Sequence, residues 1–365
     1  MTKHIQNFIK KHFSYETHVW AMGIEKTFSE DRFLKPYVLN RFKKGEKYFV
    51  LRICLDGNGP MKVFRDYVRT LPWIEENGFK PIVCWSYTEN FKRGDLSDDF
   101  WSEFFNQPVE AKDVTDHHML VSKIYADREI WAPFAKEFNG DENVKNIRVL
   151  QGEEGRDYYS RLYDLSQKAF TLKPETYAEM EKELSPYFVG GKKIMGVMMR
   201  ENFSADFKNA QASDKDRQVF DRHPTAPGLE EAVDEVARLA DEWNCDYVLV
   251  SCAWEKTVGL FKEKMGDRAV FAKRPRKSDA QVEERLNRKK ALADMTEKEK
   301  KDLGKSNRDS YRETTRGYLS EIYMLAKCDC FAGAVCGGTE GALILNGGKY
   351  EKVHIFSDES TGGMY

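Results

Sequence analysis

Arg200 is the first side chain with an evident chemical use, because it directly follows an apolar segment. Residues Ile194–Met199 are all apolar or glycine, and such a run predicts a strand buried on both faces of a parallel sheet. Ligands of open parallel sheets bind at the carboxyl ends of the strands, which is where Arg200 falls. A guanidinium there can hold a phosphate or diphosphate through paired hydrogen bonds. The alternative is a structural ion pair, with Glu201 or a nearby aspartate.

A glycine-rich turn, Cys336-Gly-Gly-Thr-Glu340, leads into an apolar helical segment that ends near Asn346. Free N–H groups at a helix N-terminus bind phosphates, and glycine lets the ligand approach the backbone closely. Thr339 is expected to be the N-cap of this helix. The alternative is an ordinary strand-to-helix turn, and Glu340 is an unfavourable neighbour for an anion. Since Arg200 and the turn both follow strands of one expected domain, they favour a nucleotide diphosphate site.

The segments that position these residues alternate between strand and helix patterns. Strands are expected over residues 47–54, 80–85, 194–199, 246–251, 268–272, 328–333 and 353–356, and helices over 158–170, 174–184, 229–243, 257–264, 318–326 and 339–346. Between the first two strands, Val63, Tyr67, Leu71 and Ile74 recur at helical spacing, which predicts a βαβ unit with parallel strands. The expected fold is α/β, with two Rossmann-like parallel-sheet domains facing each other across a cleft, over residues 1–189 and 190–365.

Residues 273–316 interrupt the second domain with many lysines and arginines, interleaved acidic residues and few large apolar ones. Thr296-Glu-Lys-Glu299 resembles a capping box, so a helical hairpin is expected. The favoured interpretation is an exposed, solvated insertion. The alternatives are a lid over an anionic ligand and a peripheral contact with acidic lipid headgroups.

Composition narrows the class of protein. The 365 residues carry 58 basic and 60 acidic side chains, so no overall charge points to nucleic acid. The seven cysteines lie mostly in apolar runs, which favours buried free thiols over a disulfide framework. No apolar signal-peptide core opens the sequence, and we expect a soluble cytoplasmic protein. His117-His118 and the late cysteines lack further ligands at metal spacing, so no metal site is expected.

Several segments, in this order, resemble bacterial fucosyltransferase-like proteins. They are Gly196–Arg200, His223–Pro227, Asp246–Ser251, Tyr318–Asp329, Gly337–Thr339 and Asn346–Tyr350, joined in the first half by the aromatic segment Phe100–Pro108. These proteins belong to the superfamily of α-1,6-fucosyltransferases, rhizobial Nod-factor fucosyltransferases and protein O-fucosyltransferases. The resemblance implies a GT-B-like fold with GDP-fucose bound in the C-terminal domain. It also implies inversion at the anomeric carbon without a metal.

The resemblance also implies roles for individual residues. Arg200 is expected to contact the donor β-phosphate, beside the phosphate-lining Gly337, Gly338 and Thr339, with His223, Ser251 and Trp254 as further donor contacts. The acceptor is expected partly in the first domain, at Asp56, Gly57, Gly59, Trp85 and Tyr87. An inverting transfer needs a base for the acceptor hydroxyl. The aspartates of the loop after Arg200 are the candidates, and we favour Asp206 and Asp221 over Asp214 and Asp216.

The sequence departs from the family pattern at the donor motif. Met198, Glu201 and Phe203 replace its usual residues, and Cys252–Trp254 lacks the acidic residues that help to read the base. The expected function is an inverting, metal-independent glycosyltransferase that moves fucose from GDP-fucose to a glycan or glycoconjugate in surface-polysaccharide assembly. The alternatives are a transferase that uses another nucleotide sugar, and a degraded homologue that binds a nucleotide or glycan without transfer.

Overall fold

The computed structural model describes residues 46–54, 59–68, 71, 74, 78–86, 99–114, 118–122, 152–201, 228–284 and 308–356. The chain divides into two compact units, neither of which is continuous in sequence. The first contains residues 1–59, 66–144 and 165–173, and the second contains residues 60–65, 145–164 and 174–365. Helix α8 (Pro174–Leu184), which precedes the expected boundary after residue 189, therefore belongs to the second unit.

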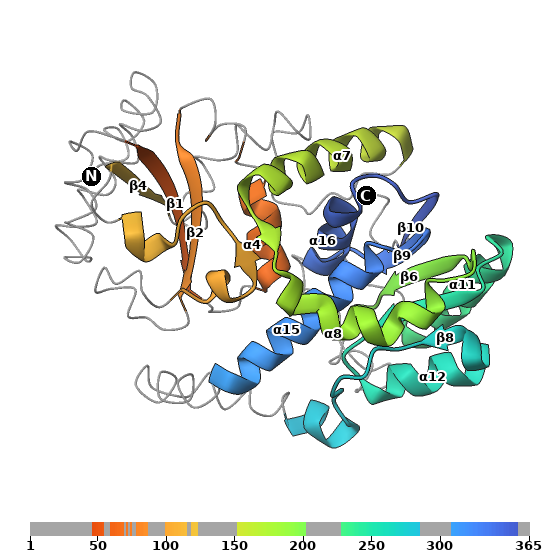
Figure 1. The fold of residues 1–365 in the computed structure, drawn as a ribbon. Helices are drawn as coiled ribbons and strands as arrows, with labels where there is room; N and C mark the ends of the chain where they lie inside the picture. Colours follow the sequence, from red (N-terminus) through yellow and green to blue (C-terminus); the bar gives the residue numbers. More distant parts are fainter. Residues whose placement is uncertain are drawn as a thin grey trace, which may run out of the picture. The chain divides into compact units, whose positions relative to one another are not determined.

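The described part of the first unit contains a parallel sheet of order β2-β1-β4. Its strands are β1 (Lys47–Cys54), β2 (Lys80–Ser86) and β4 (His118–Ser122) (Figure 1). The predicted parallel pairing of the first two strands is confirmed. The short strands β3 (Phe105–Asn106) and β5 (Thr171–Leu172) form an antiparallel pair. The first unit also contains η4 (Trp101–Glu103) and η5 (Ala111–Val114), whereas α4 (Pro60–Val68) and α7 (Gly152–Ala169) each have most of their residues in the second unit.

The second unit is built on a five-stranded parallel sheet of order β10-β9-β6-β7-β8. The strands are β6 (Ile194–Met198), β7 (Tyr247–Ser251), β8 (Ala269–Val270), β9 (Cys330–Ala334) and β10 (Lys352–Phe356). The other helices of this unit are η6 (Ser185–Tyr187), α11 (Leu229–Glu242), α12 (Glu255–Met265), η7 (Gly266–Arg268), α15 (Arg308–Leu325) and α16 (Gly337–Asn346) (Figure 1). The chain runs from β6 outward to β8, then returns to β9 on the other side of β6. The strand order thus reverses between β6 and β9, as in a Rossmann fold.

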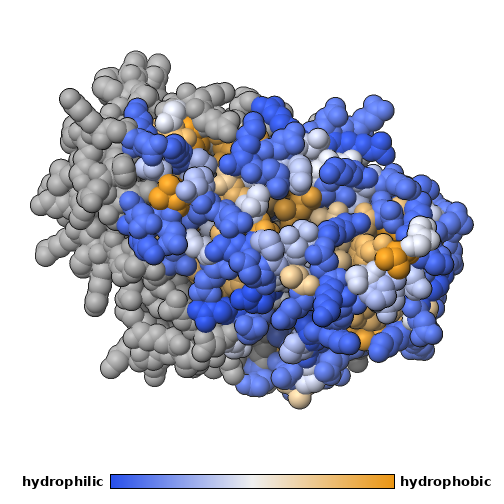
Figure 2. Space-filling view, in the orientation of Figure 1, coloured by the Kyte–Doolittle hydropathy of each residue, from blue (hydrophilic) through white to orange (hydrophobic). Residues whose placement is uncertain are grey.

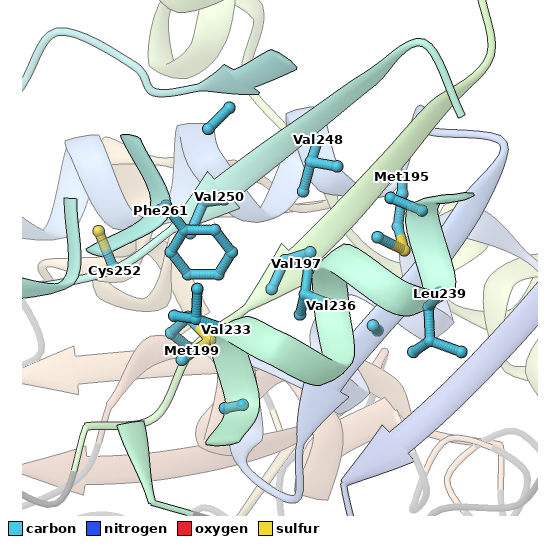
Figure 3. Packing of buried hydrophobic residues seen from close by; sticks show 14 of the residues in the cluster. Met195, Val197, Met199, Val233, Val236, Leu239, Val248, Val250, Cys252 and Phe261 are labelled. Atoms are coloured by element: carbon cyan, nitrogen blue, oxygen red, sulfur yellow. The ribbon is translucent and has the colours of Figure 1, made fainter. Parts of the chain in front are cut away.

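The core of the second unit lies between this sheet and the helices that pack on it. Figure 3 shows Val233 and Val236 of α11 and Phe261 of α12 turned toward Val197 and Val250 of the sheet. All five residues of β6 are buried, as are all five of β9, which explains why these strands are continuous apolar runs rather than alternating ones.

Gly196 sets how closely α15 packs on β6. A Cβ atom at this position would lie 3.1 Å from Leu325 Cδ2 and 3.2 Å from the Leu325 carbonyl oxygen. These separations are tighter than ordinary van der Waals contact, so the absence of a side chain brings α15 against the centre of the sheet.

The interpretation of residues 273–316 as an exposed insertion is wrong at its start, and the helix at its end begins earlier than predicted. Val282 is completely buried in the core, and the side chains of Arg274 and Arg276 are only 16% and 9% exposed. At the other end, residues 308–316 begin helix α15, ten residues before the predicted start at residue 318. Residues 285–307, with the capping-box motif, lie outside the described residues, so the lid and membrane interpretations stay predictions.

The described surface is mostly hydrophilic on the face drawn in Figure 2, with apolar residues visible mainly between polar ones. Among described residues, Val189 is the one large hydrophobic side chain counted as exposed. None of the described helices combines the length and apolar character that crossing a bilayer requires.

Replacing Phe261 by alanine tests the packing of α12 on the sheet. The ring is completely buried and meets Phe271 edge-on at 6.4 Å between centroids, so Phe261→Ala is expected to lower the free energy of unfolding by about 3–5 kcal/mol. Urea-induced unfolding measures this change. Glu263→Ala, at an exposed position of the same helix, is the control and should change stability by less than about 0.5 kcal/mol. Equal losses in both variants would contradict the packing.

Candidate functional site

The reversal of strand order places two chain segments side by side at one sheet edge. Met198, the last residue of β6, pairs with Ser251 of β7 and with Gly333 of β9. The chain leaves β6 through Arg200, and it leaves β9 through the turn that begins α16. Ligands of doubly wound sheets bind in the crevice at such a point. Arg200 and the glycine-rich turn therefore follow neighbouring strands; the sequence predicted strand ends of one domain but not that the two strands are adjacent.

The N-terminus of α16 has the geometry of an anion site. The helix begins at Gly337, and its N-cap Cys336 has extended backbone without a side-chain capping bond. The first helical bond runs from the Glu340 N–H to the Cys336 carbonyl at 3.1 Å. The N–H groups of Gly337, Gly338 and Thr339 precede this bond and have no intrahelical acceptor. They supply the positive end of the helix dipole.

Thr339 is not the N-cap that the sequence predicted. It is the third residue of the helix, and its buried hydroxyl donates to the Ala334 carbonyl. The first turn starts earlier because Gly337 and Gly338 both enter the helix. Of the groups of Thr339, only the backbone N–H belongs to the anion site.

Glu340 does not oppose an anion in the way that the sequence suggests. Its carboxylate is completely buried and forms an ion pair with Arg65, whose Nη1 lies 2.5 Å from Oε2. Arg65 and Glu340 belong to the same unit although 275 positions separate them. The charge of Glu340 is thus balanced inside the protein, and sequence reasoning missed Arg65 because nothing local links the two residues.

Arg200 is exposed and forms no ion pair with any residue that the structure describes. The alternative partner, Glu201, is used elsewhere: its carboxylate accepts hydrogen bonds from the N–H groups of Ala253 and Trp254, at 2.9 and 3.0 Å, and from the Thr257 hydroxyl at 2.8 Å. Glu201 therefore holds the turn that leads into α12 and the Thr257 side chain in its first turn, while the N-cap residue Trp254 makes no side-chain capping bond. Burial raises the pKa of Glu201, while these bonds oppose the rise.

A cluster of buried charged side chains lies at the end of β7, on the interior side of the sheet edge. The Ser251 hydroxyl donates to Glu321 at 2.6 Å, and Nε of Arg274 lies 2.6 Å from the other oxygen of Glu321. Arg276 approaches Glu321 to 3.5 Å, and Arg274 also donates to the Cys252 carbonyl at 2.8 Å. Ser251 is thus committed to the interior. Arg274 and Arg276 face Glu321, and Glu201 is also close enough to favour the charged form of Arg274. Sequence reasoning missed this cluster because both arginines fell in the supposed exposed segment.

The structure places the remaining expected donor and catalytic residues as follows. Trp254 is 1% exposed, and its indole N–H donates to Asp279 at 2.7 Å, so its side chain belongs to the interior. Asp206, Asp221 and His223, together with Asp214, Asp216 and Phe203, lie outside the described residues. Their proposed roles stay predictions.

The described part of the chain shows neither a disulfide bond at six buried cysteines nor a metal-binding cluster. Six cysteines are free and buried, as predicted: Cys84, Cys245, Cys252, Cys328, Cys330 and Cys336. Within the described ranges, no group of three or more His, Cys, Asp or Glu side chains is arranged to hold a metal ion.

On the expected acceptor side, Asp99 organises the end of β2. One oxygen of its carboxylate accepts the N–H groups of Trp85 and Trp101, both at 3.0 Å, and the other accepts the Ser102 hydroxyl. Trp85 is completely buried, and Gly59 is exposed directly before α4. The remaining acceptor-side residues, Asp56, Gly57 and Tyr87, lie outside the described residues. Burial raises the pKa of Asp99 to about 6, against the hydrogen bonds that lower it.

No protein-family model matches this chain, and no curated protein matches its sequence. Solved structures similar to it include the NodZ α-1,6-fucosyltransferase co-crystallised with GDP, with 12% identity, a TM-score of 0.41 and coverage of 82% of this chain and 93% of that chain. The NodZ fucosyltransferase from Bradyrhizobium has the same identity and TM-score, with coverage of 82% and 92%. A mutant of Arabidopsis thaliana FUT1 in complex with GDP is 8% identical, with a TM-score of 0.41 and coverage of 93% and 78%.

Asp99 makes the stability of the first unit depend on pH. Because its pKa is raised from 3.8 to about 6, the folded state holds the proton more tightly than the unfolded state. Its contribution is complete below about pH 3.8 and is lost as the pH rises through about 6, a change of roughly 2–3 kcal/mol. Asp99→Asn is expected to flatten this part of the profile, measured by urea unfolding between about pH 4 and about pH 7.

The matched control for this experiment is Asp113→Asn, at an exposed aspartate of the same unit. It should keep the wild-type slope. A wild-type profile that rises over this range, or an Asp99→Asn profile as steep as the wild-type one, would contradict the assignment.

Proposed function

We propose that the protein is a glycosyltransferase of the fucosyltransferase type, which binds a nucleoside-diphosphate sugar at the carboxyl edge of the second unit's sheet. The observation that carries the proposal is the position of Arg200 beside the N-terminus of α16, at the point where the strand order reverses. A guanidinium and a helix N-terminus at neighbouring strand ends suit a diphosphate. The motif resemblance in the same segments supports the same ligand.

The proposed reaction displaces the nucleoside diphosphate from the sugar. The acceptor oxygen bonds to the anomeric carbon from the face opposite the leaving group, while the bond to the β-phosphate oxygen breaks. The leaving diphosphate takes the electron pair, and a base takes the hydroxyl proton. Arg200 and the N–H groups of Gly337 to Thr339 would stabilise the charge on the diphosphate. In this proposal they do so without a metal, and Asp206 or Asp221 is the base.

The finer parts of the proposal rest on the sequence resemblance. GDP-fucose is the proposed donor, and a glycan or glycoconjugate of surface-polysaccharide assembly in the cytoplasm is the proposed acceptor. The proposed arrangement is GT-B-like, with the acceptor bound partly by the first domain.

A specific observation favours a second candidate function. At the end of β7, the carboxylate of Glu201 is fully engaged with the N-terminus of α12, and Trp254 is turned into the interior. Neither side chain is available to read a guanine base. A transferase for another nucleotide sugar, or a homologue that binds a nucleotide without transfer, is therefore the second candidate.

Arg200→Ala tests the proposed diphosphate site. Removing one charged hydrogen-bonding partner should weaken nucleoside diphosphate binding by roughly 1.5–3 kcal/mol, or about 10- to 150-fold. Isothermal titration calorimetry with GDP, UDP and CDP measures the effect and identifies the preferred base. Arg238→Ala is the control, because Arg238 is exposed on α11 and paired with Glu235 and Glu242. It should leave the affinity unchanged.

The proposed site is wrong if Arg200→Ala binds the preferred nucleotide as tightly as the wild type does. Release of the nucleoside diphosphate from its sugar conjugate, with and without glycan acceptors, then separates the two candidate functions. A transferase releases it in an acceptor-dependent way, whereas a binding protein does not.

A further inference from the structure

The hydroxyl of Tyr318 is a polar group at the same sheet edge that the roles above leave unused. Tyr318 lies on α15 and is partly buried. A Cβ atom built on Gly338 would lie only 2.7 Å from the Tyr318 hydroxyl oxygen and 2.9 Å from Cε of Met198. The hydroxyl therefore lies against the first turn of α16, where the helix N–H groups lack intrahelical acceptors.

This hydroxyl makes no hydrogen bond to any residue in the described part of the chain. Tyr350, a buried tyrosine of the same unit, shows the usual arrangement, since its hydroxyl donates to the Leu325 carbonyl at 2.8 Å. Tyr318 is only partly buried, and its hydroxyl is not among the fully enclosed polar atoms that lack a partner. The unused donor of Tyr318 is therefore within reach of an acceptor that a ligand supplies.

Burial and the charges around Tyr318 determine whether its hydroxyl is protonated and can donate a hydrogen bond. Burial, with Cys336 and Glu321, raises the pKa of Tyr318 well above 10.0, while Arg200 and Arg274 act in the opposite direction. The phenol is therefore neutral and protonated at physiological pH and can donate a hydrogen bond. The nearby arginine charges favour an acceptor that is an anion.

We propose that Tyr318 is a ligand-binding residue whose hydroxyl donates to an oxygen of the diphosphate held between Arg200 and the first turn of α16. This inference rests on the proposed function and adds a neutral donor to its two positive elements. It also gives Gly338 a reason to lack a side chain, because any Cβ there would displace the hydroxyl from the ligand's side of the helix.

Tyr318→Phe tests the assignment because it removes the hydroxyl and keeps the ring. The dissociation constant for the preferred of GDP, UDP and CDP should rise roughly 10-fold or more. The melting temperature without nucleotide should change little, since no internal hydrogen bond is lost. Calorimetry and thermal unfolding on the full-length protein provide the two measurements.

Tyr350→Phe is the matched control and should show the opposite result in the two measurements, melting temperature and nucleotide affinity. It leaves the Leu325 carbonyl without its donor, so the melting temperature should fall by about 2–4 °C while the affinity stays unchanged. A tyrosine with a merely structural role at position 318 would behave like Tyr350.

Gly338→Ala provides a second, independent variant. In the wild-type background the new methyl group meets the Tyr318 hydroxyl, so nucleotide affinity should fall. In the Tyr318→Phe background the 2.7 Å contact is absent, and the same substitution should cost less affinity. A double-mutant cycle measures this coupling.

The outcomes separate the inference from the function on which it rests. If none of the three nucleotides binds the wild-type protein, both are overturned. If Arg200→Ala weakens binding while Tyr318→Phe does not, the diphosphate site stands and the assignment of Tyr318 is overturned. A 10-fold loss in Tyr318→Phe with an unchanged melting temperature supports it.

Discussion

The stability of the second unit depends on hydrogen-bond donors and arginines that the fold holds against its buried carboxylates. A buried carboxylate is costly unless it is paired or hydrogen-bonded. Glu340 is paired with Arg65, Glu321 with Arg274 and the Ser251 hydroxyl, and Glu201 with the N-terminus of α12. Each of these partners is supplied by the fold itself, so none of the three carboxylates draws on Arg200.

This distribution of charge leaves Arg200 and the N-terminus of α16 as positive groups at one sheet edge although the whole chain is nearly neutral. Net charge is only -2, and in the buried cluster behind β7 the charges of Arg274 and Arg276 are offset by Glu321 and, at Arg274, by Glu201. Arg200 is exposed in front of it, and the N-terminus of α16 adds a partial positive charge. Electrostatic attraction at the edge is set by these local placements rather than by composition.

The local parts of this arrangement could be predicted from the sequence. The run from Lys47 to Cys54 gave the bounds of β1 correctly, and the parallel pairing followed from a helix between two strands. The placement of Arg200 near the glycine turn also followed, because parallel strands bring their carboxyl ends to one edge. These inferences need only periodicity and the topology of α/β folds.

The non-local parts could not be predicted. Arg65 and Glu340 are 275 positions apart, and Ser251 and Glu321 are 70 apart, so no sequence window contains both partners. The basic segment misled for a related reason, since Arg274 looks solvated until its buried partner is known. The expected N-cap at Thr339 failed because a helix start depends on where the backbone turns, and two glycines can either precede the helix or enter it.

The pairing of β6 with β9 decides which groups a ligand at this edge could meet. Met198, at the end of β6, pairs with Gly333 of β9, so Arg200 and the first turn of α16 follow neighbouring strands, and the Tyr318 hydroxyl approaches that turn from α15. An anion at this edge could therefore meet a guanidinium after one strand and helix N–H groups after the next. Met198, an apolar side chain beside Gly338, limits hydration there. Hydrogen bonds to a diphosphate are stronger where water is scarce. The apolar side chain of Met198 and the positive groups would therefore both favour binding of a diphosphate.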